Sequence, residues 1–400
     1  MTSVELFAGA GGLALGISNA GFSHKAVIEI DKDACDTIRA NQTRGLQFVK
    51  DWPLFEADVT KFAFDECGTD IDLLAAGVPC QPWSMGGKHR GYDDERNMFP
   101  ETIRAVVALR PKAILIENVK GLTRQCFANY FTYIQFMLEF PEVTRRPMED
   151  WRDHRSRLEK YVTARGKCYG GLRYNVIAKL VNAANYGVPQ RRERVFVVGF
   201  RSDLAVQWTF PKETHSQEAL LESKWITGEY WDEHKVAKSK RPKPPVNFPS
   251  SYFSGKLFNG MQIPWRTVRD AIKGLPDPEL DSGATFLNHN LNPGARSYPG
   301  HTGSPLDEPA KTLKAGDHGV PGGENTVLYP NGNLRYLTVR ESARIQTFPD
   351  QFIFRGSWSE NMRQLGNAVP VDLGQIMAAD IRRHLLEKKR ADRTAIQPAG

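Results

Sequence analysis

Short apolar runs recur along the first 200 residues, and each is followed by turn residues and then by a pattern of helical spacing. The runs are rich in Val, Ile and Leu and do not alternate with polar residues, which is typical of strands buried on both faces of a sheet. They begin near residues 3, 26, 72, 113, 175 and 194. Strand and helix in repetition predict an α/β fold with a doubly wound, mostly parallel, Rossmann-like sheet.

This alternation breaks in two places. Residues 126–170 have the pattern of helices added within a connection, whereas residues 201–335 are rich in Pro, Gly, Asn, Trp and Tyr. The second stretch predicts a smaller, irregular domain, in which the basic and Pro-rich residues 235–249 form a loop or linker. Helical periodicity returns at residue 337, and the polar residues 387–400 predict a frayed tail.

Composition and charge narrow the class of protein. The chain has 400 residues, enough for one large domain and a smaller one, and its net charge of +7 leans towards a polyanionic partner. Its five cysteines include no C-x-x-C pair, so we expect reduced thiols and neither a zinc site nor a dithiol site. The N-terminus does not resemble a signal peptide, and no apolar run could cross a membrane, so we expect a cytoplasmic protein.

A glycine-rich turn follows the first apolar run. Gly9, Gly11 and Gly12 predict a tight turn into a helix, where the missing side chains let a ligand approach the backbone. Glu29 ends the second run, and an acid at that place can accept hydrogen bonds from ribose hydroxyls. Asp58 follows the third expected strand, where it could read an adenine amino group. This pattern alone leaves NAD, FAD and S-adenosylmethionine open as ligands.

Cys80 stands in the segment GVPCQPWS, between two prolines and just past the apolar run that begins near residue 72. Ligands bind at this edge of doubly wound sheets. Proline stiffens the backbone, and a nucleophile needs a fixed position because a misplacement of about 1 Å can cost about 100-fold in rate. We therefore interpret Cys80 as a nucleophile. A buried structural role suits the other cysteines better: Cys35, Cys67, Cys126 and Cys168.

Two further polar groups are expected on the same edge. Glu117 follows an apolar run, so partial burial should raise its pKa and let it hand over or share a proton. Arg192 and Arg194 precede a buried strand, and strand alternation places both on one face. A cation there would help to hold Cys80 as a thiolate, although a solvated strand entry is the plainer alternative. Together these groups suggest addition of a thiolate to an electrophilic ring.

The chain resembles the bacterial DNA (cytosine-5) methyltransferases over nearly its whole length. The Pro-Cys-Gln and Glu-Asn-Val segments are together highly specific for that family. Six blocks occur in the family's order: FAGAGG at 7–12, GVPCQPWS at 77–84, ENVKGL at 117–122, QRRERVFVVGF at 190–200, LTVRESARIQTFP at 337–349 and QLGNAVP at 364–370.

The resemblance implies catalytic roles for Cys80, Glu117, Arg192 and Arg194. In the family the cysteine adds to C6 of a flipped-out cytosine, the glutamate contacts N3 and the exocyclic amine, and the arginines hold the base and its phosphate. S-adenosylmethionine then donates its methyl group to C5, and no metal is expected.

The resemblance also implies a cofactor pocket that the last block completes by folding back beside the first strand. Residues 85–97 match a mobile loop that closes over flipped DNA. The expected cofactor-binding residues are Phe7, Ala8, Gly9, Gly11, Gly12, Glu29, Ile30, Asp58, Pro79, Met98, Asn367 and Val369. The expected substrate-binding residues are Gln81, Ser84, Asn118, Gln190 and Thr312.

The implied organisation is a Rossmann-like methyltransferase domain, residues 1–200 and 336–400, with a target-recognition domain at 201–335. We expect a monomer that binds double-stranded DNA near the nucleoid and belongs to a restriction–modification system or acts alone. Whether a cognate endonuclease exists stays open. The alternatives are a tRNA cytosine-5 methyltransferase, an NAD-dependent oxidoreductase and a DNA-binding protein with a decayed site. The Gln-Pro-Trp-Ser segment argues against the first, and Cys80 against the second.

Overall fold

The computed structural model describes residues 1–79, 97–164, 169–245, 248, 262–280, 286–297, 302–315 and 325–396. Within it the chain forms two compact units. Unit 1 comprises Met1–Val181, Glu193–Pro211 and Gln351–Gly400, and unit 2 comprises Asn182–Arg192 and Lys212–Asp350. Composition predicted boundaries near residues 200 and 335, and the compact units divide later along the chain at both places.

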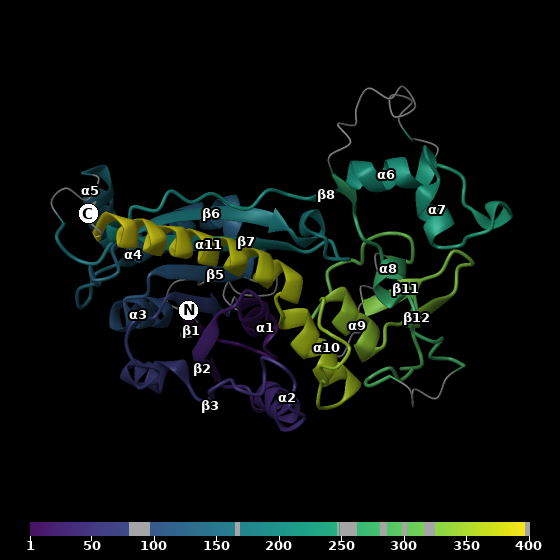
Figure 1. The fold of residues 1–400 in the computed structure, drawn as a ribbon, viewed down its shortest axis with the longest axis horizontal. Coiled ribbons are helices and arrows are strands. Elements are labelled where there is room, and N and C mark those ends of the chain that lie inside the picture. Colours follow the sequence, from purple (N-terminus) through teal and green to yellow (C-terminus); the bar gives the residue numbers. More distant parts are fainter. Residues whose placement is uncertain are drawn as a thin grey trace. The chain divides into compact units, whose positions relative to one another are not determined.

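Unit 1 is built on a seven-stranded sheet with the strand order β3-β2-β1-β4-β5-β7-β6 (Figure 1). Neighbouring strands from β3 to β5 pair in parallel, and β7 pairs antiparallel with β5. The prediction of a doubly wound, mostly parallel sheet is therefore confirmed. The strands are β1 Thr2–Leu6, β2 Ser23–Glu29, β3 Leu54–Glu56, β4 Leu73–Gly77, β5 Ala113–Val119, β6 Tyr174–Asn182 and β7 Glu193–Arg201.

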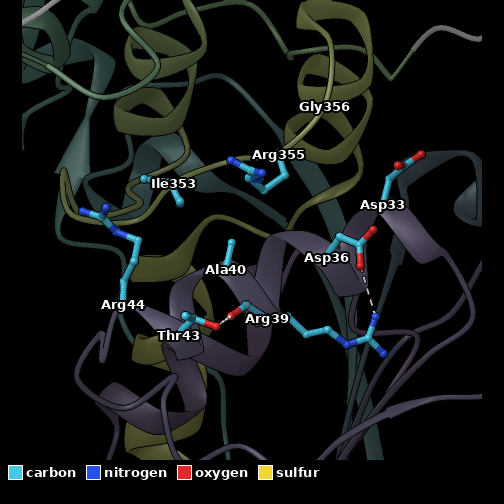
Figure 2. A pocket seen from close by; sticks show the side chains of 9 residues that line it. All are labelled: Asp33, Asp36, Arg39, Ala40, Thr43, Arg44, Ile353, Arg355 and Gly356. Carbon is cyan, nitrogen blue, oxygen red and sulfur yellow. Dashed lines mark hydrogen bonds and ion pairs between the residues drawn. The ribbon is translucent and has the colours of Figure 1, made fainter.

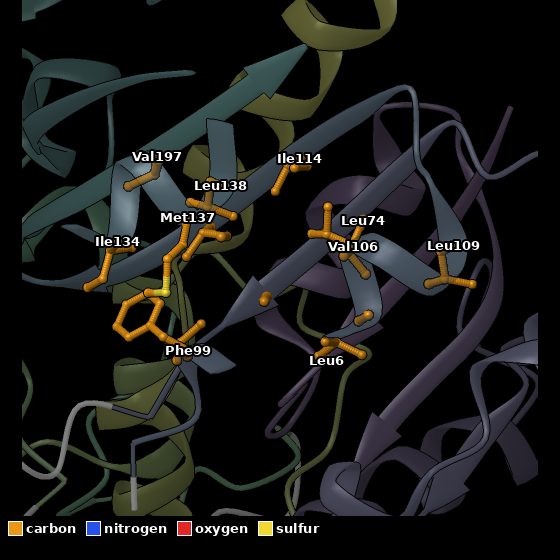
Figure 3. Packing of buried hydrophobic residues seen from close by; sticks show 14 of the residues in the cluster. Leu6, Leu74, Phe99, Val106, Leu109, Ile114, Ile134, Met137, Leu138 and Val197 are labelled. Carbon is orange, nitrogen blue, oxygen red and sulfur yellow. The ribbon is translucent and has the colours of Figure 1, made fainter. Parts of the chain in front are cut away.

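Helices α3 and α4 contribute to the apolar core on this sheet. Figure 3 shows side chains of both helices, among them Phe99 and Met137, meeting those of β1, β4, β5 and β7 in one cluster. The helices of unit 1 are α1 Gly12–Asn19, α2 Lys32–Thr43, α3 Phe99–Leu109, α4 Ala128–Glu139, α5 Trp151–Thr163, α10 Trp358–Asn367 and α11 Val371–Ile396.

The first and last helices of unit 1 pack directly together, as α1 (purple) and α11 (yellow) show in Figure 1. Gly16 makes the approach possible, because a Cβ atom there would lie 2.6 Å from the carbonyl oxygen of Val371 and 2.7 Å from the amide nitrogen of Gln375. No larger side chain fits at this contact without moving the backbone. The C-terminal segment therefore completes the same unit that the N-terminal strand begins.

Several local expectations need correction. Residues 387–396 are not frayed but continue α11, whose last turns carry the i,i+4 pairs Arg383–Glu387 and Lys388–Asp392. Cys35 and Cys67 are buried as predicted, but Cys126 is exposed. Cys168 lies outside the described residues.

Unit 2 contains two small sheets, which its composition did not predict. Strands β8 His215–Ser216 and β9 Ile263–Pro264 form one, and β10 Ser304–Pro305, β11 Thr326–Leu328 and β12 Leu334–Tyr336 form the other. Its helices are α6 Gln217–Trp225, α7 Glu229–Glu233, α8 Val268–Ile272 and α9 Val339–Ile345, so the helical pattern predicted from residue 337 is confirmed. Helix α9 belongs to unit 2, whereas the sequence pattern assigned residues 336–400 to the first domain.

Short 3-10 turns connect the elements of both units: η1 Val59–Lys61, η2 Phe64–Cys67, η3 Lys120–Thr123, η4 Gln125–Phe127, η5 Ala183–Tyr186, η6 Ser202–Leu204 and η7 Lys238–Lys240. Among the described residues, no helix is both long enough and apolar enough to cross a bilayer.

Candidate active site

The glycine turn leaves an open backbone surface at the carboxyl end of β1. Phe7 and Gly9 both adopt left-handed backbone conformations, with φ angles of 57° and 55°. A Cβ atom added to Gly9 would meet nothing within 4 Å. A left-handed conformation is rarely adopted by residues with a side chain. The turn thus presents bare backbone to solvent, next to Ala8, at the position where the sequence predicts the cofactor.

Glu29 organises this turn. Its carboxylate oxygens accept hydrogen bonds from the amides of Gly9 at 2.6 Å, Ile30 at 2.9 Å and Asp31 at 2.7 Å. Burial raises the pKa of Glu29, and the three backbone amides oppose that rise. The predicted ribose contact would therefore come from a carboxylate that already fixes the shape of the loop.

Two further predicted cofactor residues, Ile30 and Asp58, differ in what they offer a ligand. Ile30 is 64% exposed, so its apolar side chain is accessible to a ligand. Asp58 caps η1 with Oδ1, which accepts from the amide and hydroxyl of Thr60 at 2.9 and 2.8 Å. These bonds lower the pKa of Asp58, so it is an anion with its second oxygen available at neutral pH.

The remaining predicted cofactor residues lie at the ends of regular elements. Asn367 is the exposed last residue of α10, and Val369 is 4% exposed in the connection to α11. Met98 is the partly buried N-cap of α3, and Pro79 is the last described residue after β4. All four belong to unit 1, as do Gly9 and Glu29.

A pocket of about 670 Å³ on unit 1 lies apart from these residues (Figure 2). It is formed by one face of α2 and by residues 353–356, with Arg39, Arg44 and Arg355 among its lining side chains. None of the predicted cofactor residues lines it. Its size alone therefore does not make it the cofactor site.

The sheet brings the candidate catalytic groups of unit 1 to one edge. Gly77, the last residue of β4, is paired in register with Glu117 of β5. Asn118 donates a hydrogen bond from Nδ2 to the carbonyl oxygen of Val78 at 3.2 Å. This contact fixes the backbone two residues before Cys80. Cys80 itself, Gln81, Ser84 and the loop predicted at 85–97 (as far as residue 96) lie outside the described residues.

Glu117 forms an ion pair with Arg194, with 2.8 Å between Oε1 and Nε. Both side chains are largely buried, at 9% and 13% exposed, so water screens the pair weakly. Burial of Glu117 was predicted, but the arginine partner was not. Burial and an adjacent cation act in opposite directions on a carboxyl group. The arrangement can hold a hydrogen-bonding carboxyl and a cation together at the edge where β4 leads to Cys80.

Arg192 has a different setting from Arg194. β7 begins at Glu193, so strand alternation does not apply to Arg192, and the prediction that places both arginines on one strand face is wrong in that respect. Arg192 is fully buried within unit 2, where its Nη1 donates to the carbonyl oxygen of Leu313 at 3.3 Å.

Thr312 and Leu313 join the segment that carries Arg192. The hydroxyl of Thr312 donates to the carbonyl oxygen of Arg191 at 2.7 Å, and the amide of Leu313 donates to Oε1 of Gln190 at 3.1 Å. Gln190 is fully buried. Three predicted residues of unit 2 are thus brought together: Gln190, Arg192 and Thr312. The part played by the Leu313 backbone had no signal in the sequence, because any residue supplies an amide and a carbonyl.

Two groups of described side chains have donor atoms close enough for a metal ion, namely Glu233, His234 and Asp270, and Asp31, Asp33 and Glu360. Each already contains a cationic partner. Lys273 pairs with Glu233 at 3.2 Å, and Arg363 pairs with both Asp31 and Glu360. These lysine and arginine side chains supply the charge that a metal would otherwise bring.

Comparison with known proteins identifies the family. A profile of the family described as C-5 cytosine-specific DNA methylase matches residues 1–140 and 166–383. The chain belongs to this family and is a DNA (cytosine-5)-methyltransferase, as its sequence motifs predicted. The unmatched residues 141–165 include α5 and lie within the expected insertion at 126–170.

Relatives match over almost the whole chain. It is 31% identical to the type II methyltransferase M.Eco47II of Escherichia coli, over 97% of this chain and 80% of that protein. It is also 31% identical to the type II methyltransferase M.NgoPII of Neisseria gonorrhoeae, with 96% of each chain covered. The structure of S. pombe Dnmt2 methyltransferase matches with a TM-score of 0.53 at 15% identity, over 97% of this chain and 99% of that one. At that identity the likeness shows the fold.

Proposed function

We propose that this enzyme methylates C5 of a cytosine flipped out of double-stranded DNA, through a covalent bond between Cys80 and C6 of the base. The Glu117–Arg194 pair supports this most directly, because it puts a buried carboxyl and a cation at the edge of the sheet where β4 ends. The contact from Asn118 to Val78 holds the backbone leading to Cys80 at the same edge. A base within a duplex cannot reach such an edge without being extruded.

The proposed role of each group follows from its chemistry. The Cys80 thiolate adds to C6, and the electron pair of the C5–C6 bond becomes available at C5. Glu117 contacts N3 and the exocyclic amine, which draws electron density from C6 and favours the addition. S-adenosylmethionine, when bound, supplies the methyl group for C5. A base then removes the C5 proton, and the bond between Cys80 and C6 breaks to restore the double bond.

The described residues suit S-adenosylmethionine in three ways. Bare backbone at Gly9 accepts close approach of a ligand, and Glu29 offers an acid beside it. The exposed side chain of Ile30 offers an apolar contact for an adenine ring. The anionic Asp58 keeps one oxygen for an amino group. These features support the proposed cofactor without identifying it among similar nucleotides.

We further propose that unit 2 selects the DNA sequence. Its Thr312–Leu313 segment is bonded to residues 190–192, so a change in that segment is expected to reach Arg192. The relatives named type II methyltransferases suggest a modification enzyme of a restriction–modification system. A monomer acting beside an independent endonuclease is the corresponding organisation.

The substrate class is tested by incubating the purified chain with labelled S-adenosylmethionine and with either duplex DNA or tRNA. We expect label in DNA and none in tRNA. Label in tRNA alone would replace the DNA proposal with the RNA alternative. Bisulfite sequencing of the methylated DNA then gives the base, the strand and the recognition sequence in one experiment.

The covalent step is tested with duplex DNA carrying 5-fluorocytosine at the mapped target. Fluorine cannot leave C5 as a proton does, so the enzyme should remain bonded to the base. We expect a denaturation-resistant adduct that needs S-adenosylmethionine and maps to Cys80. An adduct at one of the other cysteines would refute the assignment: Cys35, Cys67, Cys126 or Cys168.

A further inference from the structure

Two segments far apart in the sequence meet beside the proposed cofactor residues. Asp31 directly follows Glu29 and Ile30, and it caps α2 by accepting from the amide of Ala34 at 2.9 Å. Its amide donates to Oε1 of Glu29 at 2.7 Å. Its other oxygen, Oδ2, accepts from Nη2 of Arg363 on α10 at 2.8 Å. A single carboxylate thus links the loop that holds the glycine turn to a helix 332 residues away.

Arg363 is fixed by a second acid on its own helix. Its Nε and Nη2 donate to the two oxygens of Glu360 at 2.8 and 2.7 Å, a bidentate pair. Glu360 and Asp31 together raise the pKa of Arg363, so it keeps its charge. The guanidinium is 27% exposed, and its position is defined by three hydrogen bonds to two carboxylates. Asn367 follows one helical turn later on the same helix.

Other contacts already hold the returning segment on α2. Asn41 donates to the carbonyl oxygen of Ile353 at 2.8 Å and accepts from its amide at 2.9 Å. The Thr37 hydroxyl donates to Gln364 at 2.8 Å and accepts from the amide of Arg355 at 3.0 Å. Figure 2 shows Ile353 and Arg355 beside this helix. Loss of Arg363 should therefore leave unit 1 folded, which separates its role from general stability.

We propose that Arg363 is a positioning residue for the cofactor, acting through Asp31. The pair sets the loop of Glu29, Ile30 and Asp31 against the end of α10, where Asn367 lies. This inference rests on the proposed use of S-adenosylmethionine. Without the pair, α10 still packs on α2 through its buried contacts, but the link from Arg363 to the loop that shapes the glycine turn is lost.

The test compares Arg363→Met, Asp31→Asn and the double variant in the full chain. Asparagine can still cap α2 through its side-chain oxygen, so Asp31→Asn removes the ion pair and keeps the helix start. We expect each single change to raise the Kd for S-adenosylmethionine about 5- to 10-fold, by calorimetry. The double variant should be no weaker than the weaker single variant, because both changes remove one interaction.

Two further readouts separate positioning from damage to the fold. The KM for S-adenosylmethionine should rise while kcat at saturation changes less than about 2-fold, and the Kd for DNA should not change. Arg363→Lys, which keeps the charge, should restore part of the affinity. Lys32→Met is the matched control, because Lys32 lies next to Asp31 on the first turn of α2 and its ion pair within the described residues is with Asp36, at 3.0 Å. Its cofactor affinity should equal that of the unaltered chain.

The outcomes distinguish this inference from the proposed function. If the unaltered chain does not bind S-adenosylmethionine, the proposed function fails. If it binds but Arg363→Met and Asp31→Asn keep its affinity within 2-fold, the positioning role is refuted. Fully additive losses in the double variant, or a parallel loss of DNA affinity, would also contradict a specific Arg363–Asp31 action on the cofactor.

Discussion

The candidate residues of unit 1 and those of unit 2 are held in place in different ways. Glu117 and Arg194 lie on paired strands, where the register of the sheet sets their positions. Gln190, Arg192 and Thr312 lie outside the named strands, where one isolated bridge between Gln190 and Ala310 and several side-chain contacts with backbone groups connect their segments. The difference suggests that unit 1 tolerates little change in its reacting groups, whereas unit 2 can vary its contacts while the chemistry persists.

The strongest test of this contrast is Cys80→Ser. A hydroxyl keeps nearly the same shape but is a far weaker nucleophile than a thiolate, so methyl transfer should fall by at least about four orders of magnitude. DNA binding should change little. Incorporation of label and gel-shift titration measure the two effects. Substantial turnover by the serine variant would refute the covalent mechanism.

Acidification should weaken unit 1 through His24. This side chain is buried between Ser3 and the carbonyl oxygen of Ala14, and burial lowers its pKa to about 4. Between pH 6.5 and pH 4 the unfolded chain binds a proton at this position and the folded chain does not, so the free energy of unfolding falls as the pH falls. The full effect is about 3 kcal/mol at pH 4.

The measurement is denaturant unfolding of the unaltered chain and of His24→Asn across that pH range. The difference between the two curves isolates His24 from Glu5, a nearby carboxyl whose pKa is raised well above its ordinary value by burial. Glu5 has the opposite effect on stability as the pH falls. A pH-independent difference would mean that His24 does not remain neutral inside unit 1.

Thr312→Val tests whether unit 2 contributes to DNA recognition. The change removes the hydrogen bond to the carbonyl oxygen of Arg191 and should cost about 1 kcal/mol, or about 5-fold in the KM for DNA. The Kd for S-adenosylmethionine should stay the same. Methylation mapping should show a relaxed site or reduced efficiency. If cofactor affinity falls while DNA use is unchanged, the proposed division of labour is wrong.

Asp58→Ala should have the smallest effect and the opposite selectivity. Asp58 makes local bonds to Thr60, so its loss should change the fold little. Removal of one hydrogen-bond acceptor from the cofactor should raise the Kd for S-adenosylmethionine about 3- to 5-fold, with the recognised DNA sequence intact. Cofactor titration and methylation mapping on the same preparation provide the comparison with Thr312→Val. A changed recognition sequence would contradict the placement of Asp58 at the cofactor.

The sequence predicts the framework of unit 1 because its strands are buried on both faces and show as uninterrupted apolar runs. It also predicts that Glu117 lies near the end of such a strand, and β5 continues from Glu117 to Val119. It does not predict the Glu117–Arg194 pair or the contact from Asn118 to Val78, since both depend on how separate strands align. The small sheets of unit 2 have strands of two or three residues, too short to produce a periodic pattern.

Single residues show the same limit. Alternation along β7 accounts for Arg194 but fails for Arg192, because the strand starts between them. Thr312 was predicted only through the family resemblance, and the structure adds its hydrogen bond to the carbonyl oxygen of Arg191. Residues 387–396 form the end of α11 instead of the expected frayed tail, because i,i+4 charge pairs stabilise the helix there. Composition shows only that these residues are polar, and not that their charges are spaced for such pairs.

The contact of α1 with α11 has a consequence for synthesis of the protein. The glycine turn is made early, but the helix that packs against Gly16 and the arginine that reaches Asp31 are made last, 332 residues after Asp31. At about 5 to 20 residues per second, that interval is roughly 15 to 65 seconds. During this time the part of α1 that packs on α11 is uncovered, so a growing chain on the ribosome should be inactive and should attract chaperones until α11 emerges.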